Sequence, residues 1–148
     1  MEQKEKEREL TSEEFIKLVE PKQQQRFLVK FPKPFDINQF VIHEASRPKY
    51  NFLEDTWGDI TFRMMDPICP STSQAVMDGL KILKEDDEFK DECIIITIEM
   101  LDPLGMSIEQ WNVKGKIKTV DFGKLTYKES DMATIEIVFL VEDAILNY

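Results

Sequence analysis

Residues 107–146 read SIEQWNVKGKIKTVDFGKLTYKESDMATIEIVFLVEDAIL and carry the clearest strand pattern in the chain. Every odd position from Ala133 to Val141 is apolar, whereas polar residues interrupt the even positions. Such alternation is typical of a strand that buries one face. A strand over residues 132–142 would span roughly 35 Å, although most strands have only about five or six residues. This length predicts a large sheet, which neighbouring chains would be able to continue.

The composition indicates one soluble, globular unit. A chain of 148 residues with 42% hydrophobic residues can bury a core without a disulfide or a metal ion. No apolar run approaches the roughly 18 residues that a membrane span needs, so we expect no insertion into a membrane. The first ten residues, MEQKEKEREL, lack the apolar core of a signal peptide, and we expect synthesis in the cytoplasm.

Acidic residues outnumber basic ones by 29 to 19, which gives a net charge of −10. This charge argues against ordinary nucleic-acid binding, because such binding neutralises phosphates with basic side chains. The acidity is also consistent with a role in solubility alone. Cys69 and Cys93 form no CxxC motif and no disulfide framework, so we expect two buried free thiols.

Two stretches predict helices. Thr11 and Glu14 fit a capping box for a short helix that ends before Pro21. A second helix is expected to begin at Ser71 or Thr72, either of which can cap it. Its apolar face has i, i+4, i+7 spacing and consists of Val76, Leu80 and Leu83.

Strands account for most of the remaining chain. They are expected at residues 26–31, 39–44, 58–65, 93–101 and 108–116, before the long C-terminal strand. An irregular arm covers residues 45–57, and a charged loop covers residues 84–92. Gly115 permits a bulge or a close crossing of strands. We expect a charged extension with a short helix over residues 1–24 and one β domain over residues 25–148.

Few residues are suited to catalysis. His43 is the only histidine and lies within a predicted apolar strand, and no GxSxG motif supplies a nucleophile. Paired carboxylates cleave glycosides at suitable separations, but an acidic chain offers such pairs by chance. The candidates are Asp59, Asp66, Glu99 and Asp102. Glycine-rich phosphate loops and the calcium-loop pattern are absent from the sequence, so we expect a structural or binding role without cofactor or metal.

Three segments mark the order of the elements: RFLVKF at 26–31, WGDIT at 57–61 and WNVKG at 111–115. The chain runs through a short helix, paired strands, an arm, a strand, a helix and a long C-terminal β region. This order resembles the tail tube protein of contractile-tailed bacteriophages and the related type VI secretion tube. The similarity extends over nearly the whole chain, and its clearest local matches lie at residues 113–125 and 135–143.

The resemblance implies a mostly β fold, an antiparallel sandwich or half-barrel with a flanking helix, in a protein that forms rings. Six subunits would make a ring, and stacked rings would make a hollow tube for DNA in the virion tail. A contractile sheath would surround the tube, and baseplate proteins would adjoin it. An acidic lumen would repel DNA phosphates and let the genome slide. No catalytic activity is implied.

The resemblance also assigns candidate residues to two surfaces. One face of the C-terminal strands would line the channel through Gln110, Asn112, Thr134 and Glu136. The other face would pack in the core through Ile135, Ile137 and Phe139. The arm, which is shorter here than is usual for the family, would contact the next ring or subunit through Arg47, Tyr50, Phe52, Leu53 and Trp57.

Other functions fit the same sequence. The chain would also suit an initiator or terminator ring of a tube, or the tube of a phage-derived injection device. From other classes of protein, an acidic tail-associated hydrolase would use paired carboxylates. A DNA mimic would fill the groove of a basic partner with negative charge.

Overall fold

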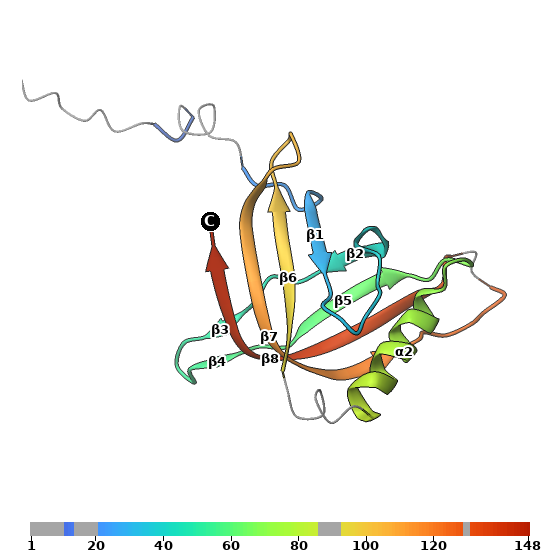
Figure 1. Cartoon of the computed structure of the whole chain (residues 1–148). Helices are drawn as coiled ribbons and strands as arrows, with labels where there is room; N and C mark the ends of the chain where they lie inside the picture. Colours follow the sequence, from blue (N-terminus) through green and yellow to red (C-terminus); the bar gives the residue numbers. More distant parts are fainter. Residues whose placement is uncertain (1–10, 14–20, 86–92, 129–130) are drawn as a thin grey trace, which may run out of the picture.

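The computed structural model describes residues 11–13, 21–85, 93–128 and 131–148. In this part of the chain, six antiparallel strands form one sheet in the order β1-β6-β7-β8-β5-β2. Their bounds are β1 (Phe27–Lys30), β2 (Ile42–Ala45), β5 (Ile60–Met65), β6 (Ile94–Leu101), β7 (Ser107–Asp121) and β8 (Thr134–Asn147). The sheet bends into a half-barrel, and helix α2 (Thr72–Glu85) flanks it (Figure 1). The predicted mostly β fold is confirmed.

The β7–β8 hairpin joins the two halves of the sheet. Its register shifts twice, because Lys118 in β7 and Glu142 in β8 are extra residues without a partner opposite. Bulges of this kind bend and twist strands, and both strands curve strongly (Figure 1). The alternation predicted for the last strand is confirmed from Ile135 to Val141, where the odd positions are buried. After the Glu142 bulge the phase changes, and Ala144 packs on the core instead.

Gly115 lies where the curved strands approach each other most closely. A Cβ atom at this position would stand 2.0 Å from the carbonyl oxygen of Leu140 and 3.0 Å from the Phe139 ring. Such a contact is impossible without a shift of backbone, so only glycine fits. The sequence predicts either a bulge or a close crossing of strands at Gly115. The structure has both features, because a register shift also begins at this residue.

The core lies between the concave face of the sheet and α2. Its largest fully buried side chains come from five strands and the helix, and include Phe62, Phe139, Met64, Ile96, Ile137, Val113, Val29 and Val76. The helix packs its predicted apolar face, with Leu80 and Leu83, against this core. Asp66 and Ser71 cap its N-terminus: the Asp66 carboxylate accepts hydrogen bonds from the backbone N–H of Thr72 and Ser73 at 3.0 and 3.1 Å.

Two predictions of local structure are wrong. Residues 39–44 do not form one strand, because Asn38 caps a short 3-10 helix, η1 (Gln39–Val41), and β2 begins only at Ile42. The arm is not irregular either. Strands β3 (Tyr50–Asn51) and β4 (Thr56–Trp57) pair as a small hairpin. The turn at Asp55 and the packing of Tyr50 on Trp57 support this hairpin, although its sequence lacks a strand pattern.

The thiols are free, as predicted, but the prediction that both are buried is wrong. Cys69 is exposed because it lies between two prolines in the loop that leads to α2. Cys93 is half-buried, and its thiol donates a hydrogen bond of 2.9 Å to the Glu142 carboxylate. That hydrogen bond raises the pKa of the Cys93 thiol, with further contributions from burial and from the carboxylate charge.

Some predictions fall outside the described residues. The helix predicted between Thr11 and Pro21 and the charged loop over residues 84–92 lie largely there. The division at residues 24 and 25 stays a prediction for the same reason. Within the described part of the chain, no helix has the length and apolar character to cross a membrane.

Candidate assembly surfaces

Two long strand edges have no strand partner among the described residues. Strand β6 pairs only with residues 107–115 of β7, so residues 116–121 are bonded to β8 alone. Strand β5 pairs only with residues 134–139 of β8, so residues 140–147 are bonded to β7 alone. We call these segments the β7 edge and the β8 edge. Their free backbone groups are ready to pair with another strand.

The two edges carry opposite charges. The β7 edge carries Lys116, Lys118 and Asp121, whereas Glu142 and Asp143 lie on the β8 edge. Lys118 also forms an ion pair of 3.0 Å with Asp59. The two acids of the β8 edge repel those of another β8 edge and attract Lys116, which favours head-to-tail pairing between copies over pairing of two β8 edges.

The arm projects from the β8 side of the molecule (Figure 1). The ring of Tyr50 packs at 4.9 Å from Trp57, which in turn packs at 6.3 Å from Trp111 of β7. The Tyr50 hydroxyl donates a hydrogen bond to Asp55, whose φ of 51° closes the turn. This hydrogen bond is the largest cause of a raised pKa of Tyr50. The tip is left in solvent: Phe52 is 82% and Leu53 is 98% exposed.

Glu109 anchors the base of the arm. Its buried carboxylate accepts a hydrogen bond from Lys22 at 3.0 Å and forms an ion pair with Arg47 at 3.4 Å. Burial alone would raise the pKa of Glu109, but the hydrogen bond and the two positive charges outweigh it, so the pKa lies below its usual value. One carboxylate thus ties the chain before β1 and the start of the arm to β7.

The four residues predicted to face a channel lie on the sheet face away from the core, but the structure does not bring them together. Gln110 and Asn112 pair with Asn147 and Ile145 at one end of the hairpin, and Asn112 accepts a hydrogen bond from Thr97 at 3.1 Å. Thr134 and Glu136 pair with β5 at the other end. There Glu136 accepts a hydrogen bond of 3.2 Å from Arg63. Their channel role stays a prediction.

The carboxylates considered for catalysis have structural partners on separate parts of the fold. Asp66 caps α2, and its hydrogen bonds, above all the one from the Ser73 hydroxyl, lower its pKa. Asp102 accepts hydrogen bonds from two backbone N–H groups of the β6–β7 turn. Glu99 and Asp59 form ion pairs with lysines. His43 is exposed on β2. Among the described residues, no group of acids, histidines or cysteines is arranged to hold a metal ion.

Sequence reasoning missed the two edges and the role of Glu109. The edges follow from how far β5 and β6 extend along the hairpin, which no local pattern encodes. Glu109 does carry a signal, because it falls on the same phase of β7 as Trp111 and Val113. A charged residue in that position needs a hydrogen-bond or ion-pair partner.

The sequence matches no protein-family model and no curated protein. Solved structures do share the fold. A chain in the sheath-tube complex of an extracellular contractile injection system, PVC, in its extended state aligns with a TM-score of 0.62 and 18% identity, over 93% of this chain and 99% of that one. The chain has a tail-tube-like fold. The resemblance found in the sequence is therefore confirmed at the level of the fold.

The same tail-tube-like fold occurs in other parts of such machines. A chain of the tube-terminating cap of the anti-feeding prophage aligns with a TM-score of 0.60 and 14% identity, over 87% of this chain and 92% of that one. A chain of the baseplate of the anti-feeding prophage gives 0.58 and 17%, over 87% and 97%. Near-complete coverage on both sides indicates one shared architecture without a large insertion.

Proposed function

We propose that this chain is a structural subunit of the inner tube of a contractile tail, either of a bacteriophage or of a related injection device. The observation that carries the proposal is the pair of unpaired, oppositely charged strand edges on a tail-tube-like fold. Joining the β7 edge of one copy to the β8 edge of the next would remove both edges from solvent.

This pairing is heterologous and repeats around a ring. A heterologous interface closes into a ring when the rotation between neighbouring copies is a whole fraction of a full turn. The resemblance to tail tubes supports six copies. The half-barrels would then merge into one continuous sheet. Rings stacked on one another would form the tube, with the sheath outside and baseplate proteins at its end.

The distribution of charge supports a tube that lets DNA pass without binding it. Residues 1–20, 86–92 and 129–148 together contain 17 acidic and five basic residues, whereas the rest of the chain contains 12 acidic and 14 basic ones. On the face away from the core, Arg63 pairs with Glu136 and Lys118 pairs with Asp59. If this face lines the lumen, these ion pairs neutralise Arg63 and Lys118, and DNA would pass without specific binding.

A role in a terminal ring is the second candidate. The fold is shared with chains from cap and baseplate structures as well as from a sheath-tube complex. An end ring would differ by blocking further stacking. We propose no catalytic role, because the candidate acids already serve as a helix cap, a turn cap and ion-pair partners.

Electron microscopy of the purified protein tests the proposal. We expect rings with a central hole that stack into tubes as the concentration rises. Single rings that never stack would favour the terminal role. A monomer that persists throughout the micromolar range would contradict both. Cleavage of cell-wall glycan that is lost on Glu99→Gln would favour the hydrolase, and salt-sensitive competition with DNA for a basic protein would favour the DNA mimic.

A further inference from the structure

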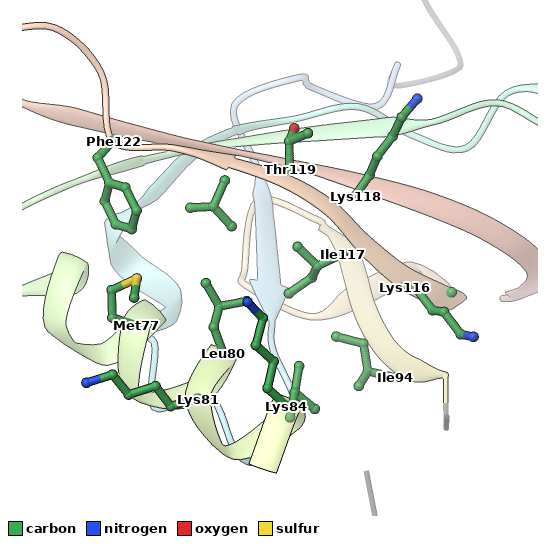
Figure 2. Close-up of a pocket in the computed structure, with 13 residues that line it drawn as sticks. Met77, Leu80, Lys81, Lys84, Ile94, Lys116, Ile117, Lys118, Thr119 and Phe122 are labelled. Carbon is green, nitrogen blue, oxygen red and sulfur yellow. The ribbon is translucent and has the colours of Figure 1, made fainter. Parts of the chain in front are cut away.

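An open groove of about 530 Å³ lies between α2 and the β7 edge (Figure 2). Its floor is apolar and is formed by Leu80, Ile94, Ile117 and Val120. Met77 and Phe122 stand at its mouth and are 40% and 41% exposed. Among the described residues, the helix thus leaves part of the core uncovered along one strand edge. Covering an apolar floor of this size with another apolar group is favourable, because it removes apolar surface from water.

The rim of the groove is basic, although the chain as a whole is acidic. Lys81 and Lys84 project from α2, and Lys116 stands at the far side on β7 (Figure 2). Within the described part of the chain, none of these three lysines has an acidic partner within 4.0 Å. An occupant that fits the groove therefore combines a compact apolar group with negative charge.

The tip of the arm has this chemistry. Phe52 and Leu53 are exposed, and Glu54 follows them directly. Asp55 is held by Tyr50, which fixes the shape of the tip before any contact forms. Exposed apolar residues on a preformed hairpin are typical of a contact surface, and a preformed shape lowers the entropic cost of binding.

The arm of a molecule does not reach its own groove. The β3–β4 hairpin and α2 lie at opposite ends of the sheet (Figure 1). In the proposed ring, however, the β7 edge beside the groove pairs with the β8 edge of the neighbouring copy. That same edge carries the arm, because β4 contacts β8, and Trp57 packs on Trp111, the partner of Leu146. In that pairing, the arm of one copy and the groove of the next stand at the same seam between the two edges.

We infer that the arm tip of one copy docks in the α2–β7 groove of its neighbour. Phe52 and Leu53 cover the apolar floor, and Glu54 lies among Lys81, Lys84 and Lys116. The inference rests on the proposed self-assembly and gives the arm a receptor within it. It also explains why an exposed apolar tip and an exposed apolar groove persist on one chain: assembly covers both.

Disulfide cross-linking tests the inference directly. In full-length protein with Cys69→Ser and Cys93→Ser, Leu53→Cys is combined with Met77→Cys at the mouth of the groove. Mild oxidation of assembled protein is expected to join copies into a ladder on a non-reducing gel, because a disulfide needs Cα atoms within about 7 Å. The matched control combines Leu53→Cys with Ile68→Cys, which is fully exposed outside the groove and should stay monomeric on the gel.

A charge exchange provides an independent readout. Glu54→Lys alone and Lys84→Glu alone should each raise the concentration needed for assembly at least about threefold, and the double variant should recover most of the loss. Both positions lie on the surface, so folding is unaffected.

The outcomes separate this inference from the proposed function. Rings that form without the Leu53–Met77 cross-link and without charge rescue would overturn the docking site while leaving the tube proposal intact. Absence of rings in the unmodified protein would overturn the tube proposal itself, and the docking site with it. Cross-linking equal to that of the Ile68 control would show random collision and also overturn the inference.

Discussion

At the scale of single residues, buried side chains on the odd positions of β8 determine whether the sheet forms. Ile135, Ile137 and Phe139 are fully buried, and Ile137 and Phe139 have strands on both sides. These positions could be predicted from the sequence, because strict alternation leaves only one way to bury a face. Glu109 could not be assigned in the same way, because its partners Lys22 and Arg47 are distant in sequence.

Ile137→Asp is expected to prevent folding. Ile137 is 0% exposed within the hydrophobic core, so an ionised side chain there costs about 4–5 kcal/mol or more. Circular dichroism and urea unfolding measure the loss. Thr134→Asp, on the exposed side of the same strand, should fold normally. A soluble Ile137→Asp protein with an unchanged unfolding midpoint would contradict the packing described.

Glu109→Gln should lower stability by about 1–2 kcal/mol at neutral pH, because the hydrogen bond to Lys22 loses its charge. The folded-state pKa of Glu109 lies below its usual value, so its contribution is complete above that usual value and is lost as the pH falls through the folded pKa. Urea unfolding from pH 7 down to pH 3 should show the two proteins converging at the acidic end. A difference in the free energy of unfolding between the two proteins that stays constant from pH 7 to pH 3 would mean that the negative charge of Glu109 does not contribute to stability.

At the scale of elements, the sequence supports the strands and α2 but not the way they bend. The alternation in β8 predicts one straight strand, whereas the bulges at Lys118 and Glu142 turn the hairpin and change the buried phase. A bulge adds one residue to an otherwise regular pattern, so it is not apparent from one strand alone. In the arm, by contrast, the structure has paired strands that the sequence pattern does not predict. Its pairing depends on the Tyr50, Trp57 and Trp111 rings, which meet only in the folded molecule.

Gly115→Ala tests the close approach within the hairpin. The added methyl group would clash with the backbone of Leu140, and we expect a loss of about 1–3 kcal/mol in the free energy of unfolding. Gly58→Ala is the matched control, since its Cβ would meet only ordinary contacts at 3.6 Å. Equal unfolding midpoints for the two variants in urea would show that the crossing tolerates a side chain.

At the scale of the whole molecule, the described residues leave two different strand edges without a strand partner. One is the β8 edge, on the side of the exposed arm, and the other is the β7 edge, with the groove beside α2. A sequence predicts a large sheet from the length of its strands, but it does not show where neighbouring strands stop. The unpaired edges arise because β7 and β8 extend beyond β6 and β5, and these edges are the reason to expect a partner.

Hydrogen exchange followed by mass spectrometry tests the pairing of these edges most directly. Peptides that cover residues 116–121 and 140–147 should exchange quickly at outward-pointing amides in the free subunit and at least about tenfold more slowly in assembled rings. Residues 136–139, which have strands on both sides, serve as the control and should be protected in both states. Edges that remain unprotected in assembled rings, or that are equally protected in the free subunit, would contradict the proposed ring.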